Sequence, residues 1–373
     1  MAAPLSGIKV LDFSTLLPGP MATLFLAEAG AEVIKVERPG RGEDMRHFEP
    51  SWGGEAVNFA MLNRGKKSIA LDLKDPQERA RLKPLIESAD ILVEQFRPGV
   101  MQRLELDYAT VSRINPKLIY CSISGFGQTG PKRDRAGHDI NYIGDAGLLS
   151  LSMGTADTPV IPPALIADIA GGSYPAVLNI LLALRERDRT GKGTYIDIAM
   201  TEGVLPFMYW AIGNGLGADT WPESGGELVT GGSPRYRLYV TADGKFVAAG
   251  PLEDKFWAAF AQTIGLEEQY RNDRVDPQAT ARRVAEIIAM RDAAHWEPLL
   301  RQADCCCTIV KSVREALQDE HVRERGVLKA QLRNQQGETM PATPVPIVLS
   351  LRAHAADAVA APALGSHNDE LLK

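Results

Sequence analysis

The chain has 373 residues, of which 45% are hydrophobic and 24% are charged, a composition typical of a soluble globular protein. Its length favours about two domains over a single core. The formal net charge of -6 argues against a surface that attracts nucleic acid, so a polyanionic ligand would need a local basic patch.

The N-terminal residues show no basic stretch followed by an apolar one, so no signal peptide is predicted. No apolar run approaches the ~20 residues that a membrane helix needs. The cysteines, Cys121 and the run 305–307, lack the spacing of zinc ligand pairs, and we expect reduced, mostly buried thiols. These patterns predict a cytoplasmic protein without a membrane partner.

Short β-rich runs alternate with helical segments over the first 200 residues. In chain order we expect strand 7–14, helix 18–31, strand 32–40, strand 67–75, helix 76–90, strand 91–96, strand 117–127, helix 171–193 and strand 193–200. Short links between a strand, a helix and the next strand imply parallel pairing. The fold class predicted is therefore α/β, with a Rossmann-like layer.

The character of the sequence changes after this region. Residues 213–236 are dense in Gly, Ser and Pro and are predicted to be irregular. A hairpin over 236–250, with an Asp243-Gly244 turn, is followed by expected helices 253–264, 278–291 and 293–302. We interpret 226–320 as a smaller α+β domain.

The first turn between a strand and a helix, "STLLPGP", lacks the G-x-G-x-x-G pattern of dinucleotide sites. Glu37 at the end of the second strand is the only feature that would suit the ribose of NAD, so an NAD site is disfavoured. No phosphate-binding loop of the G-x-x-x-x-G-K-[ST] type and no G-x-S-x-G elbow is present.

His138, in "AGHDINY", is the histidine with the strongest indication of chemistry. It lies among small residues at an expected helix start, where the helix dipole disfavours imidazolium and suits a neutral base. Gly137 would let a ligand approach the backbone. The alternative, a histidine that only caps a helix or bonds in the core, is favoured by this stretch alone.

Two acids are further candidates. Asp168 stands between Ile and Ala residues in "PPALIADIAGGS", where a carboxylate needs partners or a raised pKa. A helix N-cap explains Asp168 equally well. Glu253 opens a helix after the hairpin, and a plain helix-terminal acid is its simpler interpretation.

Basic residues follow several predicted strands: Arg38, Lys74, Arg97 and Arg103. Ligands of α/β sheets bind at the carboxyl ends of parallel strands. Together these residues indicate a phosphate-rich ligand.

The stretches "LSGIKVLDFSTLLPGPMATLFLAEAGAEVIKVERPG", "EQFRPGV", "YCSISGFGQTGP", "AGHDINYI", "TGKGTYIDIAM" and "LGSHNDELL" together resemble the family III CoA-transferase (CaiB/BaiF) superfamily. Within it, "GHDINY" and "ADIAGGS" resemble the α-methylacyl-CoA racemase branch. The resemblance implies an interlocked homodimer of a Rossmann-like large domain and a smaller α+β domain. The implied bounds are 1–200 with 335–373 for the large domain, 201–225 and 321–334 for linkers, and 226–320 for the small domain.

The resemblance also implies that an acyl-CoA thioester is the ligand. By residue match, the expected CoA contacts are Arg38, Leu71, Asp72, Leu73, Lys74, Gln95, Phe96, Arg97, Arg103, Gly137, Asp139, Ile140, Asn141 and Tyr142.

In the racemase branch, His138 and Asp168 would be the two catalytic bases on opposite faces of a planar enolate, and Glu253 of the partner subunit would orient the histidine. The backbone N–H near Asp139 would receive charge from the thioester oxygen. No metal or redox cofactor is required.

The transferase branch remains the alternative. There Asp168 would form an acyl-aspartyl anhydride, shielded by a glycine-rich loop such as 224–234. The transferase pattern needs no histidine at 138, so the presence of His138 and Glu253 favours racemisation. The acyl group is not predicted by this sequence, and the run Cys305–Cys307 has no functional interpretation.

Overall fold

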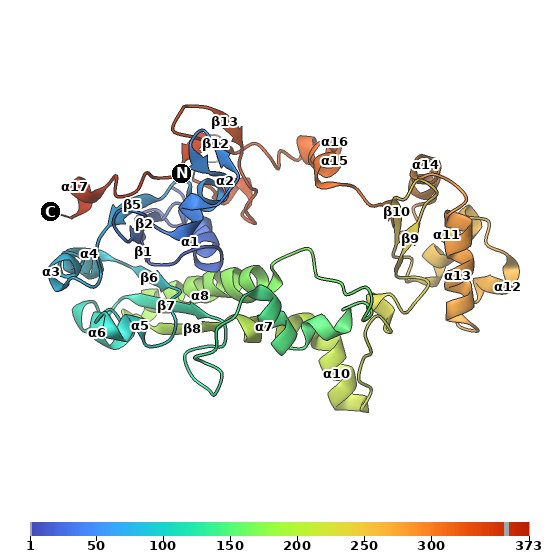
Figure 1. Ribbon diagram of the computed structural model, residues 1–373, viewed down its shortest axis with the longest axis horizontal. Helices are drawn as coiled ribbons and strands as arrows, with labels where there is room; N and C mark the ends of the chain where they lie inside the picture. The colour runs from blue at the N-terminus through green and yellow to red at the C-terminus, as the bar shows by residue number, and fades with distance from the viewer. Residues whose placement is uncertain (1, 354–357, 373) are drawn as a thin grey trace. The chain divides into compact units, whose positions relative to one another are not determined.

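The computed structural model describes residues 2–353 and 358–372. Contacts divide the chain into two compact units (Figure 1). Unit 1 comprises Met1–Ala146, Pro163–Phe207 and His321–Lys373, and unit 2 comprises Gly147–Pro162 and Met208–Glu320.

Unit 1 is built on a six-stranded sheet with the order β5-β2-β1-β6-β7-β8. Every neighbouring pair in this sheet is parallel. The strands are β1 (Lys9–Asp12), β2 (Glu32–Glu37), β5 (Lys67–Ala70), β6 (Ile91–Glu94), β7 (Ile119–Ser124) and β8 (Tyr195–Ala199). In chain order this is the 3-2-1-4-5-6 arrangement of a Rossmann fold. The predicted α/β class with a Rossmann-like large domain is confirmed.

Both faces of this sheet are covered. Val10 and Leu11 are consecutive residues of β1 and therefore point to opposite faces, yet each is 0% exposed. One face packs against Leu85 and Ile86 of α4 and Val111 of α6.

The helices of this part are α1 (Pro18–Glu28), α2 (Val57–Asn63), α3 (Pro76–Ala80), α4 (Lys83–Ser88), α5 (Val100–Arg103), α6 (Tyr108–Ile114) and α7 (Asp139–Asp145), with the 3-10 turn η1 (Asp44–His47) and the short strands β3 (Ser51–Trp52) and β4 (Glu55–Ala56).

The helix predicted over 76–90 is two helices, α3 and α4. Pro84 lies in the first turn of the second one, where its fixed φ suits a helix start and its missing N–H breaks continuity.

The long helix expected over 171–193 begins earlier and in a different geometry. A π-helical segment, η3 (Ala167–Ser173), runs directly into α8 (Tyr174–Thr190). By length and composition, the helix Ala167–Thr190 is long and apolar enough to cross a membrane. No apolar run of that length was expected from the sequence. One such helix is weak evidence for a membrane span. In unit 1, α8 packs against α1 and β7. Its outer side carries exposed Leu178 and Leu182.

The C-terminal part of unit 1 lies beside its N-terminal part. Sheet β13-β12-β14 consists of β12 (Gln331–Arg333), β13 (Thr339–Pro341) and β14 (Ala358–Ala360). Leu332 of this sheet shares a core with Phe59 and Ala60 of α2. After the 3-10 turn η6 (Leu349–Leu351), the chain ends with α17 (Asn368–Leu371), which lies along the edge strand β5.

Unit 2 contains a three-stranded antiparallel sheet, β11-β10-β9, with β9 (Arg237–Val240), β10 (Phe246–Ala249) and β11 (Cys307–Ile309). The hairpin expected over 236–250 is thus present. The helices are α10 (Tyr209–Ala218), α11 (Asp254–Thr263), α12 (Glu268–Arg271), α13 (Pro277–Ile288), α14 (Ala293–Ala303) and α15 (Val313–Leu317), with the 3-10 turns η2 (Leu148–Leu151) and η5 (Leu228–Thr230). Trp257, Phe260 and Trp296 form its core.

The prediction of irregular structure from residue 213 was wrong for 213–218, which belong to α10. Of the glycines there, Gly215 has a packing reason. A Cβ on Gly215 would lie 2.4 Å from the Trp221 ring, so this glycine admits the ring rather than breaking the helix.

The boundaries of the two units differ from the expected ones. Segment 147–162 belongs to unit 2, and Gly225 N–H donates to Leu151 O at 2.9 Å there. Residues 208–225 also belong to unit 2, whereas 321–334, expected to be a linker, belong to unit 1 because β12 pairs with β13 and β14. The helices α9 (Met200–Gly203) and α16 (Glu320–Glu324) and the turn η4 (Leu205–Met208) lie near these boundaries. Residues 1 and 373 of the expected large domain lie outside the described residues.

Candidate active site

Two pockets open at the carboxyl ends of the central strands of unit 1. The basic pocket, about 560 Å³, is lined by residues that follow β1, β2, β5 and β6, including Arg38, Lys74 and Arg103. The histidine pocket, about 510 Å³, is lined by His138, Asp168 and residues that follow β1, β6 and β7. Thr15 and Phe96 line both pockets, so the two are neighbours. They lie where the strand order reverses between β1 and β6, the usual ligand position in such sheets.

His138 is the N-cap residue of α7, as the expected helix start required. Its backbone N–H donates to Asn141 Oδ1 at 3.0 Å, which fixes the entry of the chain into the helix. The residue is exposed and lines the histidine pocket. Its capping position and a chemical role are therefore compatible.

Asp168 lies inside the π-helical segment η3 and is not a helix N-cap, so that alternative was wrong. π-helical turns are rare and are frequent at functional sites. The Asp168 N–H donates to Asp139 Oδ2 at 2.9 Å. Burial and the neighbouring Asp139 carboxylate raise the pKa of Asp168 from 3.8 to about 6, although His138 acts against them.

Close backbone packing fixes the position of η3. A Cβ on Gly171 would lie 2.4 Å from Met200 O, and a Cβ on Gly203 of α9 would lie 2.3 Å from Gly171 O. Ser173 Oγ donates to Pro18 O at 2.8 Å, which ties η3 to the start of α1. The glycines of "ADIAGGS" thus let the Asp168 segment seat against α9.

Gly137 lines the histidine pocket, where it was predicted to let a ligand reach the backbone, and its lack of a side chain also has a packing reason. A Cβ on Gly137 would lie 2.7 Å from the ring of Tyr142, and a Cβ on Gly125 would lie 2.3 Å from the same ring. The Tyr142 hydroxyl donates to Gly137 O. Both glycines therefore make room for Tyr142, which supports the loop that carries His138.

The structure places most of the predicted CoA contacts on the two pockets. Arg38, Leu71–Lys74, Phe96 and Arg103 line the basic pocket, and Gln95, Phe96, Arg97, Gly137, Asn141 and Tyr142 line the histidine pocket. Asp139 and Ile140 line neither: Asp139 is buried against the Asp168 backbone, and Ile140 is exposed.

Three further arginines in these pockets were missed from the sequence: Arg79 in the basic pocket, and Arg133 and Arg135 in the histidine pocket. Arg79 lies in α3, and the other two precede the His138 loop without following a strand, so a rule based on strand ends does not find them.

Glu253 lies in unit 2, where it is the exposed N-cap residue of α11. Its expected pairing with His138 of a partner subunit stays a prediction. Of the cysteines, Cys121, Cys305 and Cys307 are buried and Cys306 is exposed. Among residues 2–353 and 358–372 no group of three or more His, Cys, Asp or Glu side chains is arranged to hold a metal ion.

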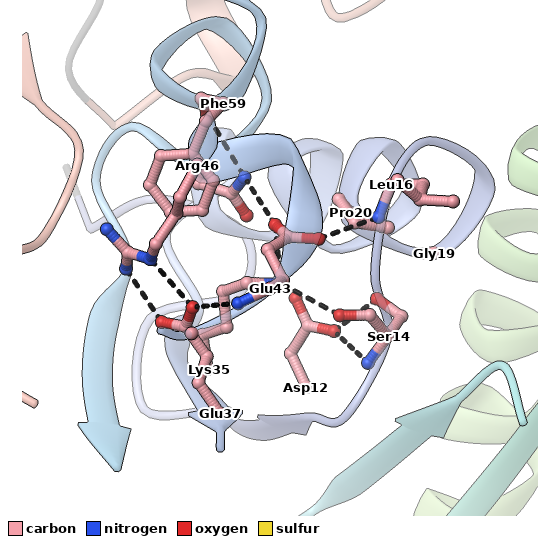
Figure 2. A network of polar contacts seen from close by, with 12 residues as sticks. Asp12, Ser14, Leu16, Gly19, Pro20, Lys35, Glu37, Glu43, Arg46 and Phe59 are labelled. Carbon is pink, nitrogen blue, oxygen red and sulfur yellow. Dashed lines mark hydrogen bonds and ion pairs between the residues drawn. The ribbon is translucent and has the colours of Figure 1, made fainter. Parts of the chain in front are cut away.

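A buried charge network, which sequence reasoning did not single out, reaches the basic pocket through Glu43; Figure 2 shows Asp12, Lys35 and Glu43 close together. The network joins Asp12, Lys35, Glu43 and Lys66, which are all 4% exposed or less. The sequence feature that could have revealed this network is a charged residue inside an apolar strand, as in "KVLD" and "EVIKVE".

The six-stranded Rossmann-like sheet, with a basic pocket and an acid–histidine pocket at its switch point, defines an α/β protein with a candidate ligand site at the usual position for such sheets. The family model of CoA-transferase family III matches residues 5–368, and the chain belongs to that family.

Relatives in this family have two activities. The chain is 35% identical to "Alpha-methylacyl-CoA racemase" of Homo sapiens, over 99% of this chain and 92% of the relative. It is 32% identical to "Succinyl-CoA:glutarate CoA-transferase" of Mus musculus, over 99% of this chain and 86% of the relative. Among solved structures, Rv3272 from M. tuberculosis has a TM-score of 0.83 at 27% identity, with 99% of each chain covered. A CaiB/BaiF family protein from Brucella suis has a TM-score of 0.81 at 28% identity, with 100% of each covered.

Proposed function

We propose that this chain inverts the α-carbon of 2-methylacyl-CoA thioesters by 1,1-proton transfer through an enolate. The observation that carries the proposal is that His138 and Asp168 line one pocket, with Asp168 held by the residue that follows the histidine. Inversion needs one base on each side of a planar carbon, and this pocket offers two titratable groups from two different elements.

The reaction proceeds in two proton transfers. His138 removes the α-proton of one enantiomer, which leaves an enolate whose thioester oxygen carries the charge. Asp168, in its protonated form, then delivers a proton to the opposite face; the other enantiomer reacts with the roles exchanged. The backbone N–H of Asp139 donates to the enolate oxygen.

The environment of Asp168 supports this role. A carboxyl group with a pKa of about 6 exists in both protonation states near neutral pH, as a group that accepts a proton in one direction and donates it in the other must. An ordinary aspartate, with a pKa of 3.8, would be a poor proton donor there.

The basic pocket supports CoA as the anchor of the substrate. Arg38, Lys74 and Arg103 line it beside the apolar walls of Leu71 and Phe96, which suits phosphates and an adenine ring. Since Thr15 and Phe96 also line the histidine pocket, a CoA chain can pass from one pocket to the other.

We also propose that the chain acts as a homodimer in which Glu253 of the partner orients His138. Glu253 and the imidazole are both exposed, and each lies at a helix start. Exposed Leu178 and Leu182 on α8 support burial against a second copy. A carboxylate beside the imidazole would stabilise its protonated form.

CoA transfer through an acyl-aspartyl anhydride on Asp168 is the second candidate. CoA-transferase relatives at 30–33% identity favour it. A second supporting observation is the glycine-rich segment 224–234, which includes Gly225 and Gly231 in left-handed conformation. This route makes Asp168 a nucleophile and leaves His138 without a required step.

The test is α-proton exchange with solvent. Wild-type protein in deuterium oxide should exchange the α-proton of a 2-methylacyl-CoA without any added acceptor acid. Asp168→Ala should abolish inversion and would abolish transfer as well, so His138→Ala separates the two reactions. We expect His138→Ala to lower exchange by about 100-fold or more, the contribution of a general base.

CoA transfer to a free carboxylate, retained in His138→Ala and unaccompanied by proton exchange in the wild type, would overturn the racemase proposal in favour of the transferase.

A further inference from the structure

The turn from β1 to α1 forms the wall between the two pockets. Thr15 lines both pockets, and Leu16 lines the histidine pocket. Leu16 has φ of 62°, in the left-handed region that a leucine side chain disfavours. A residue keeps such a conformation only when its surroundings hold it there.

The Glu43 carboxylate holds Leu16 in this conformation. Its Oε2 accepts the Leu16 N–H at 2.7 Å, and its Oε1 accepts Lys35 Nζ at 3.2 Å and Asn63 Nδ2 at 3.4 Å (Figure 2). Glu43 is 4% exposed and itself lines the basic pocket. One buried carboxylate therefore touches the walls of both pockets.

The charges around Glu43 keep the same turn in place from the other side. Lys35 Nζ also donates to Ser14 O at 2.8 Å, and Asp12 Oδ1 accepts the Ser14 N–H at 2.9 Å. Burial alone would raise the pKa of Asp12, but Lys66 and Lys35 hold it well below its usual range, so Asp12 stays ionised. The backbone of 14–16 is thus held by two buried acids and a buried lysine.

We propose that Glu43 is a positioning residue for the reaction: by holding Leu16 in its left-handed conformation, it sets the wall that directs the CoA thioester toward His138 and Asp168. This inference rests on the proposed function for the identity of the reaction, and on hydrogen bonds and burial for the role of Glu43.

Glu43→Gln is a sharp test because every group that faces this carboxylate is a donor. A glutamine must turn its NH₂ toward either the Leu16 N–H or the Lys35 ammonium, so one of these contacts becomes donor against donor. Glu43→Asp keeps both acceptor oxygens and shortens the side chain by one carbon, so it should recover part of the function.

Glu28→Gln is the matched control. Glu28 is a buried carboxylate of unit 1, paired with Arg64 at 2.8 Å and with Arg352 at 2.9 Å, and it lines neither pocket. The Glu28→Gln variant should lose stability, as Glu43→Gln does, but should keep the wild-type kcat.

Two readouts are measured on the full chain. Hydrogen exchange resolved to the Leu16 amide should be at least about tenfold faster in Glu43→Gln than in wild type or Glu28→Gln, with Glu43→Asp between them. The kcat for α-proton exchange should fall about 10- to 100-fold in Glu43→Gln with a smaller change in KM, since a displaced pocket wall misaligns the reacting carbon. If Glu43→Gln does not fold, Glu43→Asp carries both comparisons.

An unchanged Leu16 exchange rate in the Glu43 variants, or an equal loss of kcat in Glu28→Gln, overturns the proposal. If the wild type transfers CoA instead of exchanging the α-proton, the kcat comparison is made on transfer. If it does neither, the proposed function has failed, and Leu16 exchange still decides whether Glu43 holds this wall.

Discussion

At the scale of single residues, the Asp139 carboxylate connects the two candidate bases, His138 and Asp168. It follows His138 in the chain, is 5% exposed, and accepts the backbone N–H of Asp168 at 2.9 Å. The same carboxylate contributes to the raised pKa of Asp168. Asp139, which was expected to contact CoA, thus has a second role: it fixes the Asp168 backbone and raises the pKa of the Asp168 carboxyl group.

The pH dependence of proton exchange follows from this contact. Asp168 accepts a proton only when ionised, so for the enantiomer that Asp168 deprotonates, kcat/KM should fall about tenfold per pH unit below pH ~6, where the carboxyl group is protonated. Asp139→Asn keeps an acceptor for the Asp168 N–H and removes the negative charge, so the pKa of Asp168 falls and the acid limb should move to lower pH. Profiles of kcat/KM against pH for the two proteins check this, and an acid limb unmoved by Asp139→Asn would show that burial alone sets the pKa.

Sequence reasoning found His138 and Asp168 but not the link between them. The histidine stands out because its neighbours are small, and the aspartate because its neighbours are apolar. The hydrogen bond from Asp168 to Asp139 spans 29 residues and depends on the π-helical geometry of η3, which no local pattern encodes. The packing role of Gly137 was not foreseen for the same reason, since Tyr142, five residues later, fills the space beside it.

At the scale of elements, η3 and α9 pack closely, backbone against backbone, near the site. Gly171 and Gly203 face each other across this contact, with Met200 O directly over Gly171. The parallel strands of this unit were predictable from apolar runs and turn residues. The π turn was not, because "ADIAGGS" has a helical pattern and its extra residue per turn follows from tertiary packing.

Gly171→Ala should test this packing. A Cβ 2.4 Å from Met200 O cannot be accommodated without moving η3, so we expect a loss of about 1–3 kcal/mol in the free energy of unfolding together with reduced kcat. Urea unfolding and steady-state kinetics measure the two effects. Gly213→Ala in α10 is the control, since nothing lies within 4 Å of its Cβ and alanine favours a helix by about 0.5–1 kcal/mol. Equal stability of Gly171→Ala and wild type would contradict the packing argument.

At the scale of the whole molecule, the C-terminal tail lies along β5, the edge strand of the central sheet. His367 N–H donates to Ser68 O at 3.0 Å, and Leu372 belongs to the core beneath β5. The sequence predicted a large Rossmann-like domain, and the family resemblance predicted that the tail completes it. Periodicity alone gives no partner for "LGSHNDELL", because its contacts lie ~300 residues away in the chain.

Asn368 is the residue through which this long-range contact reaches the basic pocket. Its Oδ1 accepts the Ala70 N–H at 2.8 Å and its Nδ2 donates to Ala70 O at 3.2 Å, at the last residue of β5 before the pocket wall 71–74. Asn368→Ala leaves both backbone groups of the edge strand without these partners, which should cost about 1–3 kcal/mol of unfolding free energy. Because the same strand end carries Leu71–Lys74, affinity for CoA should weaken as well.

Chemical unfolding and calorimetric titration with CoA measure these two losses, with exposed Asp369→Ala as the neighbouring control. A variant that loses stability but binds CoA as wild type does would mean that the pocket wall keeps its shape without the tail. Loss of both, with Asp369→Ala unchanged, would establish that the far end of the chain supports the pocket lined by residues between 13 and 104.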